Sequence, residues 1–175
     1  MALMQEIEAV PLSYPTVTGL SQAATALDAD TIWQRMEAYC RSRWTAREVV
    51  WIIEGEGDWT PPLSPASITL AEKWESDAWT AVTLPEGPYG YCLPSDGPYR
   101  ISADVGGGTV PAAAVEAFRR LAEYLAEETD KAGVSSYTLN MGPIDESYQR
   151  SPTWVARAMQ LSGAADLLRP YRRLK

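Results

Sequence analysis

Three stretches of the chain repeat apolar residues at spacings of three and four, which is the pattern of a helix with one buried face. They cover residues 28–44, 110–131 and 151–161. In the first stretch, Asp28 and Asp30 lie in the turn where the helix dipole favours negative charge. Its apolar face comprises Ile32, Trp33, Met36, Tyr39, Cys40 and Trp44. We therefore predict three amphipathic helices.

The ends of the later helices carry local signals. Thr109 is a suitable N-cap for the second helix, and Lys131–Gly133 offers a cation followed by a C-terminal glycine. The third helix is expected to begin at Ser151–Pro152, because proline is tolerated at the first helical position. A short helix over 164–168 is expected to follow it.

Between the first two helices, residues 47–105 change to the alternation of apolar and polar side chains that is typical of β-strands. Turn-forming glycine, proline and aspartate residues separate the alternating segments. We predict an antiparallel sheet of four or five strands, over residues 48–53, 67–74, 79–84, 90–93 and 99–105. Residues 134–150 are interpreted as a connector with a short strand at Ser136–Leu139.

This element order predicts the α+β class rather than alternating strand–helix units. The expected fold is a small helical bundle with an antiparallel β-sheet inserted between the first and second long helices, plus extended N- and C-terminal arms. The N-terminal arm covers residues 1–27 and has a short strand around Thr16–Thr18, with a disordered terminus as the alternative. A connector domain covers 28–161, with the β insertion at 47–105, and the C-terminal arm covers 162–175.

The composition limits which catalytic and metal sites this chain can form. The 175 residues include no histidine and two cysteines, Cys40 and Cys92. This chain alone therefore cannot form a Ser–His or Cys–His pair, a His-ligated metal site or a four-cysteine zinc site. We expect no catalytic residue, no cofactor, no metal and no enzymatic activity. Cys40, on the apolar helix face, is interpreted as a small core residue.

The chain carries a net charge of −8, and this charge is uneven. Residues 1–149 hold 9 lysines and arginines against 22 acidic residues, whereas residues 150–175 hold 6 against 1. An acidic body argues against a protein that wraps nucleic-acid phosphates. No apolar run approaches the ~20 residues of a membrane span, and no signal-peptide pattern opens the chain. Synthesis in the cytoplasm, with no membrane association, is expected.

Three local motifs each allow two interpretations. Gly106–Gly108 before a helix could cradle a phosphate, but it lacks the lysine of a nucleotide loop, and a flexible joint is favoured. The acidic turn Glu54–Asp58 could ligate calcium, but it lacks the full loop pattern, and a solvated turn is favoured. The third motif is a set of four tryptophans, Trp51, Trp59, Trp74 and Trp79. It could be a sugar-stacking platform, although core packing is favoured.

The basic C-terminal segment interleaves apolar and cationic residues. Nucleic-acid contact, a solvated terminus and insertion into an acidic groove of another protein are three alternatives. The apolar residues between the charges favour the third, because a purely electrostatic arm does not need them. They are Leu167, Leu168, Tyr171 and Leu174.

Four segments of the chain, in this order, resemble segments of a known protein family. They are Met36–Arg47, a long helix running into a strand; Pro62–Trp74, a proline-led strand; Tyr99–Pro111, a strand followed by glycines and a helix start; and Ser162–Arg173, the most specific. Over residues 30–175 the chain resembles the head–tail connector proteins of long-tailed bacteriophages and gene transfer agents, also called adaptor or head-completion proteins. It departs from them in residues 1–27, which do not clearly show the short opening helix of many relatives.

The resemblance implies structural work at the head–tail junction of a virion. Such proteins form a ring, usually of twelve copies, beneath the portal protein. The ring extends the DNA channel, through which DNA passes without specific binding, and supports a tail-joining protein, either a stopper or a tail terminator. In relatives the C-terminal arm docks on the portal. Carried over here, the portal-binding arm comprises Leu167, Leu168, Arg169, Tyr171, Arg172, Arg173, Leu174 and Lys175.

A different class of function remains as the alternative. The tryptophan-rich sheet is also compatible with a monomeric carbohydrate- or peptide-binding module. Aromatic faces stack on sugars, and an outward-facing tryptophan serves protein contacts. This alternative predicts ligand-dependent quenching of tryptophan fluorescence, and a glycan screen without such a shift would exclude it.

Overall fold

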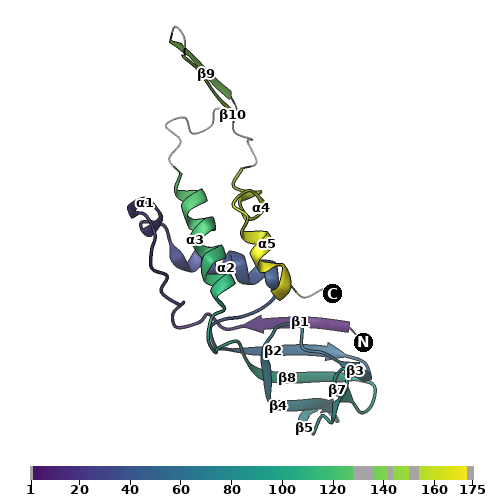
Figure 1. The fold of residues 1–175 in the computed structure, drawn as a ribbon. Coiled ribbons are helices and arrows are strands. Elements are labelled where there is room, and N and C mark those ends of the chain that lie inside the picture. The colour runs from purple at the N-terminus through teal and green to yellow at the C-terminus, as the bar shows by residue number, and fades with distance from the viewer. Residues whose placement is uncertain (1, 128–135, 142–143, 150–153, 173–175) are drawn as a thin grey trace. The chain divides into compact units, whose positions relative to one another are not determined.

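The fold is α+β, as the sequence predicts (Figure 1). The structure is a computed structural model that describes residues 2–127, 136–141, 144–149 and 154–172. The chain divides into two compact units. The sheet unit comprises Met1–Pro15, Glu37–Val110 and Tyr171–Lys175, and the helical unit comprises Thr16–Met36 and Pro111–Pro170. The predicted division into two arms and a connector domain stays a prediction.

The sheet unit contains two antiparallel sheets. Five strands lie side by side in the larger sheet (Figure 1). Their order is β1 (Ala2–Glu8), β2 (Arg47–Glu54), β8 (Pro98–Val105), β4 (Ala66–Glu75) and β5 (Ala78–Ala81). The smaller sheet has the order β3 (Gly57–Trp59), β7 (Gly90–Leu93) and β6 (Glu86–Gly87). All five predicted strand segments between residues 47 and 105 are confirmed, although the one predicted at 79–84 ends at Ala81. The prediction of a single sheet is wrong, because β7 pairs with β3 and β6, which were not predicted, in the smaller sheet.

The core of the sheet unit follows from the alternation in β2 and β8. Val49, Trp51 and Ile53 are buried, while Glu48 and Glu54 on the same strand are exposed. Burying each large apolar side chain contributes roughly 1.5–3 kcal/mol. The other buried members of this core are Trp59, Leu63, Ala71, Leu93, Tyr99, Ile101, Ala103 and Val105. Side chains from both sheets therefore share one core.

The N-terminal segment differs from the predicted extended arm, because residues 1–27 contain the strand β1 and the short helix α1 (Gln22–Thr25). The short strand expected around Thr16–Thr18 is absent, and the strand lies instead at β1, paired antiparallel with β2 from Ala2↔Glu54 to Glu8↔Val49. The physical reason is contact with distant residues. The carboxylate of Glu6 accepts a hydrogen bond from Trp51 Nε1 at 2.9 Å, and Glu8 joins an ion cluster.

This ion cluster consists of Glu8, Glu37, Arg43 and Arg47. Arg43 Nε lies 2.6 Å from Glu8 Oε1, and Arg47 Nη1 lies 2.8 Å from the same oxygen. Arg47 Nη2 reaches Glu37 Oε2 at 2.8 Å, and Glu37 Oε1 accepts the backbone N–H of Trp44 at 2.8 Å. Glu37 is 2% exposed and both arginines are 9% exposed. The cluster thus joins β1, the end of α2 (Ala29–Cys40) and the start of β2.

The two carboxylates of the cluster respond to it in opposite directions. Burial disfavours the charged form of Glu8, but hydrogen bonds and charges from Arg43 and Arg47 outweigh burial and lower its pKa. For Glu37 burial dominates and raises the pKa, although the Trp44 N–H and Arg47 oppose it. Glu8 is therefore the carboxylate whose ionisation favours the folded state.

The helical unit is built around α3 (Ala112–Ala126). Phe118 packs against Trp33, with ring centroids 4.9 Å apart, and Glu123 accepts hydrogen bonds from the backbone and hydroxyl of Ser21 at 2.7 Å each. Ser21 also caps α1 (Gln22–Thr25) by accepting the Ala24 N–H. The remaining helices are α4 (Ala158–Leu161) and α5 (Ala164–Leu168), and both pack against α3.

Several helix ends differ from the predictions. The first helix ends at Cys40 rather than residue 44, because Arg41 takes a φ of 60°. In α3 the N-cap is Pro111, without a side-chain hydrogen bond, rather than Thr109. The same helix ends at Ala126, because the backbone of Glu127 leaves the helical region, whereas the predicted end at Lys131–Gly133 lies outside the described residues.

The last third of the chain contains a strand pair that sequence reasoning only half found. The strand predicted at Ser136–Leu139 is confirmed as β9 (Ser136–Met141). It pairs antiparallel with β10 (Ile144–Gln149), which was not predicted. The third predicted helix is regular only over α4, and its predicted start at Ser151–Pro152 lies outside the described residues. The short helix at 164–168 is confirmed as α5.

The substitution Glu8→Gln tests the ion cluster. We expect it to lower the free energy of unfolding by about 2 kcal/mol at pH 7, because two buried arginines lose a charged partner. The folded pKa of Glu8 lies below the ordinary value of 4.5. Its stabilisation is therefore complete above that pH and is lost as the pH falls through the lower folded value.

Urea unfolding of both proteins between pH 3 and pH 7 measures this effect. The difference in unfolding free energy is expected to shrink towards acid pH. A difference that stays constant over this range would contradict the role assigned to the Glu8 carboxylate.

Candidate interaction site at the C-terminal end

The apolar residues of the C-terminal segment are divided between core and surface. Gly163, with a φ of 75°, is the N-cap of α5 and separates that helix from α4. Leu168 is fully buried, and α5 packs against α3 within the helical unit. Leu167 is half-buried. Leu168 is therefore a core residue of its own chain, and not an exposed anchor.

The residues after α5 contact the sheet unit, to which Tyr171 and Arg172 belong. Ser42 Oγ donates a hydrogen bond to the carbonyl oxygen of Tyr171 at 3.0 Å. The Tyr171 ring meets Trp44 edge-on, with centroids 6.5 Å apart. The guanidinium of Arg172 lies 5.2 Å above the centre of the Tyr39 ring, within the range of a cation–π interaction. These contacts fix the direction of the chain as it passes residue 172.

Cys40 lies in the same neighbourhood and is fully buried. Burial raises the pKa of its thiol to about 12, although the positive charge of Arg172 acts in the opposite direction. The thiol is therefore protonated at neutral pH, and the thiolate needed for nucleophilic chemistry is not available. The interpretation of Cys40 as a core residue is confirmed.

The exposed part of the segment is cationic. The Arg169 side chain is 82% exposed and lies 3.5 Å from Asp166, which is similarly exposed. Such a surface ion pair contributes roughly 0–1 kcal/mol, so a stronger partner readily replaces it. Arg172 is also exposed. The other predicted members of the arm, Arg173, Leu174 and Lys175, lie outside the described residues.

The other candidate motifs do not form ligand sites. Gly106, Gly107 and Gly108 all have positive φ values, and a Cβ at Gly106 would lie 2.5 Å from the Thr45 carbonyl oxygen, so backbone conformation and close approach account for glycine there. In the described part of the chain no group of three or more Asp, Glu or Cys side chains is arranged to hold a metal. Within the same residues, no helix is long and apolar enough to cross a membrane.

The four tryptophans do not share one surface. Trp51 and Trp59 are buried in the core, where their rings meet edge-to-face with centroids 5.6 Å apart. Trp74 and Trp79 form a separate cross-strand pair, and the Arg100 guanidinium lies 4.7 Å above the Trp79 ring centre. A four-tryptophan stacking platform is therefore absent, and core packing holds for Trp51 and Trp59.

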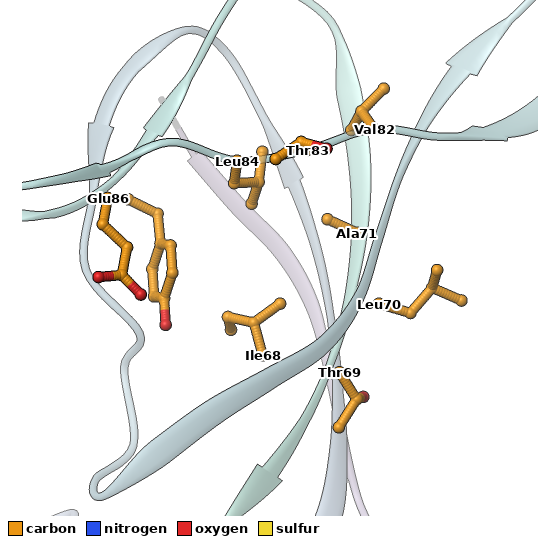
Figure 2. Close-up of a pocket in the computed structure, with 9 residues that line it drawn as sticks. Ile68, Thr69, Leu70, Ala71, Val82, Thr83, Leu84 and Glu86 are labelled. Carbon is orange, nitrogen blue, oxygen red and sulfur yellow. The ribbon is translucent and has the colours of Figure 1, made fainter.

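A small groove lies at the edge of β4 (Figure 2). Ile68 and Leu84 project into it, whereas Leu70 points away. Its volume is about 270 Å³, just below the ~300–1,000 Å³ of small-molecule sites. Its lining is Ile68, Thr69, Leu70, Ala71, Val82, Thr83, Leu84, Glu86 and Tyr91. Neither this groove nor the ion cluster was found from the sequence. The groove depends on how the segment after β5 crosses β4, and the ion cluster joins residues up to 39 positions apart.

Comparison with known proteins gives matches only among solved structures. No protein-family model and no curated protein matches the chain. One match is a chain from the neck of an empty gene transfer agent (GTA) particle, computed with C6 symmetry. It is 15% identical with a TM-score of 0.56, and the match covers 98% of this chain and 97% of that one. A chain from the neck of the native GTA particle, computed with C12 symmetry, is 13% identical with a TM-score of 0.50, covering 84% of this chain and 80% of that one.

A third match comes from the virion of the native gene transfer agent (GTA) particle. It is 14% identical with a TM-score of 0.50, covering 84% of this chain and 75% of that one. At these identities the comparisons establish a shared fold. In the first match that fold extends over almost the whole length of both chains.

Paired substitutions separate the core and surface parts of the C-terminal segment. We expect Leu168→Ala to lower the free energy of unfolding by about 2–5 kcal/mol, because it leaves a cavity beside α3. Arg169→Ala is expected to change it by less than about 0.5 kcal/mol, because the side chain is exposed. Urea denaturation measures both, and similar effects of the two substitutions would contradict this assignment.

Proposed function

We propose that this chain is a structural protein of a phage-like or gene transfer agent particle, located in the neck between head and tail. The observation that carries the proposal is the fold shared over 98% of the chain with a protein from a GTA neck. The chemistry of the chain agrees with a structural role. It lacks histidine, and one of its two cysteines is buried with a thiol pKa of about 12.

The proposed assembly is a ring, with twelve copies as the expected number. Two of the similar structures are particle necks computed with C6 and C12 symmetry, which supports a cyclic arrangement. The charge of residues 1–149 supports passage of DNA through the ring. With 22 acidic residues against 9 basic ones, this body repels phosphates and does not hold the DNA in place.

The C-terminal segment is the proposed contact with the portal. Leu168 and Tyr171 are held by their own chain, and they present Arg169 and Arg172 to solvent. Because contacts within the chain already hold residues 168–172, docking through them costs less conformational entropy than docking of a free arm. Arg173, Leu174 and Lys175 continue the proposed contact. A stopper or tail-terminator protein is the proposed partner on the tail side.

Charge reversal at Arg169 and Arg172 tests portal binding. The double substitution Arg169→Glu and Arg172→Glu is expected to weaken binding to the portal protein of the same particle at least tenfold, because it replaces two cations with anions at the contact. Arg157→Glu, the same change at another exposed arginine, is the control and is expected to bind normally. Biolayer interferometry with the full chain measures the affinities.

Binding by the doubly substituted chain at the wild-type affinity would rule out the proposed contact. Circular dichroism checks that the variants remain folded. Electron cryomicroscopy of the particle tests the broader proposal, because a neck ring made of this chain is expected between the capsid vertex and the tail. A particle whose neck lacks the chain would contradict it.

A further inference from the structure

The five-stranded sheet has an unpaired backbone at both of its edges. At one edge, no described residue pairs with the outer side of β1. At the other edge, β5 covers only the Glu72–Glu75 half of β4, and one further bond joins Val82 N–H to the Ala71 carbonyl. The half of β4 from Ala66 to Leu70 is therefore unpaired on that side in the described part of the chain.

Both open edges carry apolar side chains. On β1, Leu3, Met4 and Ile7 are 46%, 62% and 52% exposed. Beside the open half of β4 lies the groove of about 270 Å³ into which Ile68 and Leu84 project (Figure 2). Exposed apolar edge strands are avoided in soluble proteins unless another chain covers them. Each edge is therefore suited to pairing with a strand of another chain.

The strand directions make the two edges compatible. β1 is antiparallel to β2, β2 to β8 and β8 to β4, so β1 and β4 run in opposite directions. A neighbouring copy related by the small rotation of a ring keeps nearly the same strand directions. Its β1, placed beside the open half of β4, therefore forms an antiparallel pair. The neighbour's β1 then lies in line with β5. It pairs with the part of β4 that β5 and Val82 do not cover.

We propose that β1 of one copy adds to the open Ala66–Leu70 half of β4 in the next copy and inserts an apolar side chain into the groove. The inference rests on the proposed function in one respect, because the ring supplies the neighbouring copy. The contact is heterologous, so repeating it around a closed ring pairs the outer side of β1 and the open half of β4 in every copy.

Charge favours this arrangement over pairing of β1 with itself. A two-fold β1–β1 contact brings the Glu6 carboxylates of both copies to a shared edge, and like charges on paired strands are destabilising. The open half of β4 has no charged residue, and the groove beside it is lined by one, Glu86. The groove also matches an aliphatic side chain, and self-pairing of β1 leaves it empty.

The paired length is short. Each strand has a register shift within it, between Leu3 and Gln5 in β1 and between Ile68 and Leu70 in β4. Four or five paired residues bury much less than the ~1,200–2,000 Å² of a stable protein interface. The contact is therefore weak between free subunits and becomes effective when a template holds the copies side by side.

Cross-linking captures such a weak contact. Two full-length proteins carry Ile7→Cys or Ser67→Cys, each with Cys92→Ser, and the buried Cys40 stays in place. Ile7 and Ser67 are exposed on the facing edges. The two proteins, one of them isotope-labelled, are mixed at high concentration with a short thiol-to-thiol cross-linker. Mass spectrometry then counts mixed and like-with-like dimers.

Mixed Ile7–Ser67 dimers are expected to exceed both like-with-like dimers several-fold. The control replaces Ser67→Cys by Leu161→Cys, an exposed position in α4, and is expected to give no excess. Equal yields in the test and the control overturn the inference, and so does a dominant Ile7–Ile7 dimer. Because Arg169 and Arg172 are unchanged, a chain that binds the portal but gives no excess refutes the edge contact alone.

Discussion

The position of the N-terminal strand depends on the ion cluster of Glu8, Glu37, Arg43 and Arg47. β1 has little apolar burial of its own, since all of its residues except Glu8 are exposed. Backbone pairing with β2 and the bonds of Glu6 and Glu8 hold it in place. Two buried arginines would be costly without carboxylate partners, so the cluster requires β1 as much as β1 requires the cluster.

The sequence predicted the elements whose signals are local. The alternation in β2 and β8 and the apolar faces of α2 and α3 each lie within one segment, so periodicity located them. The strand β1 was not predicted, because Glu8 and Arg43 are 35 positions apart and nothing near Glu8 in the sequence indicates its partner. The helix ends were wrong where backbone conformation decided them, as at Arg41, whose left-handed φ has no signal in an arginine.

The C-terminal segment shows why the candidate site was only partly predictable. Alternating leucine and arginine residues indicate a surface with a buried side and a solvated side, but such a pattern does not say which chain covers the buried side. In this structure Leu168 is covered by its own helical unit, and the Tyr171 carbonyl is bound by Ser42. The charged half of the pattern, Arg169 and Arg172, remains at the surface. The sequence therefore predicted a candidate site in this segment, and the structure divides the described residues of the segment between a buried set and an exposed set.

The same division applies to β1. Its inward carboxylates, on Glu6 and Glu8, bind Trp51 and the two arginines of their own chain. Its outer backbone edge and its exposed Leu3 and Ile7 take no part in those bonds. Because the bonds of Glu6 and Glu8 hold β1 in place, β1 does not need its apolar side chains for its own stability. Those residues are then available for a neighbouring copy, which a strand anchored by burial of its apolar face could not offer.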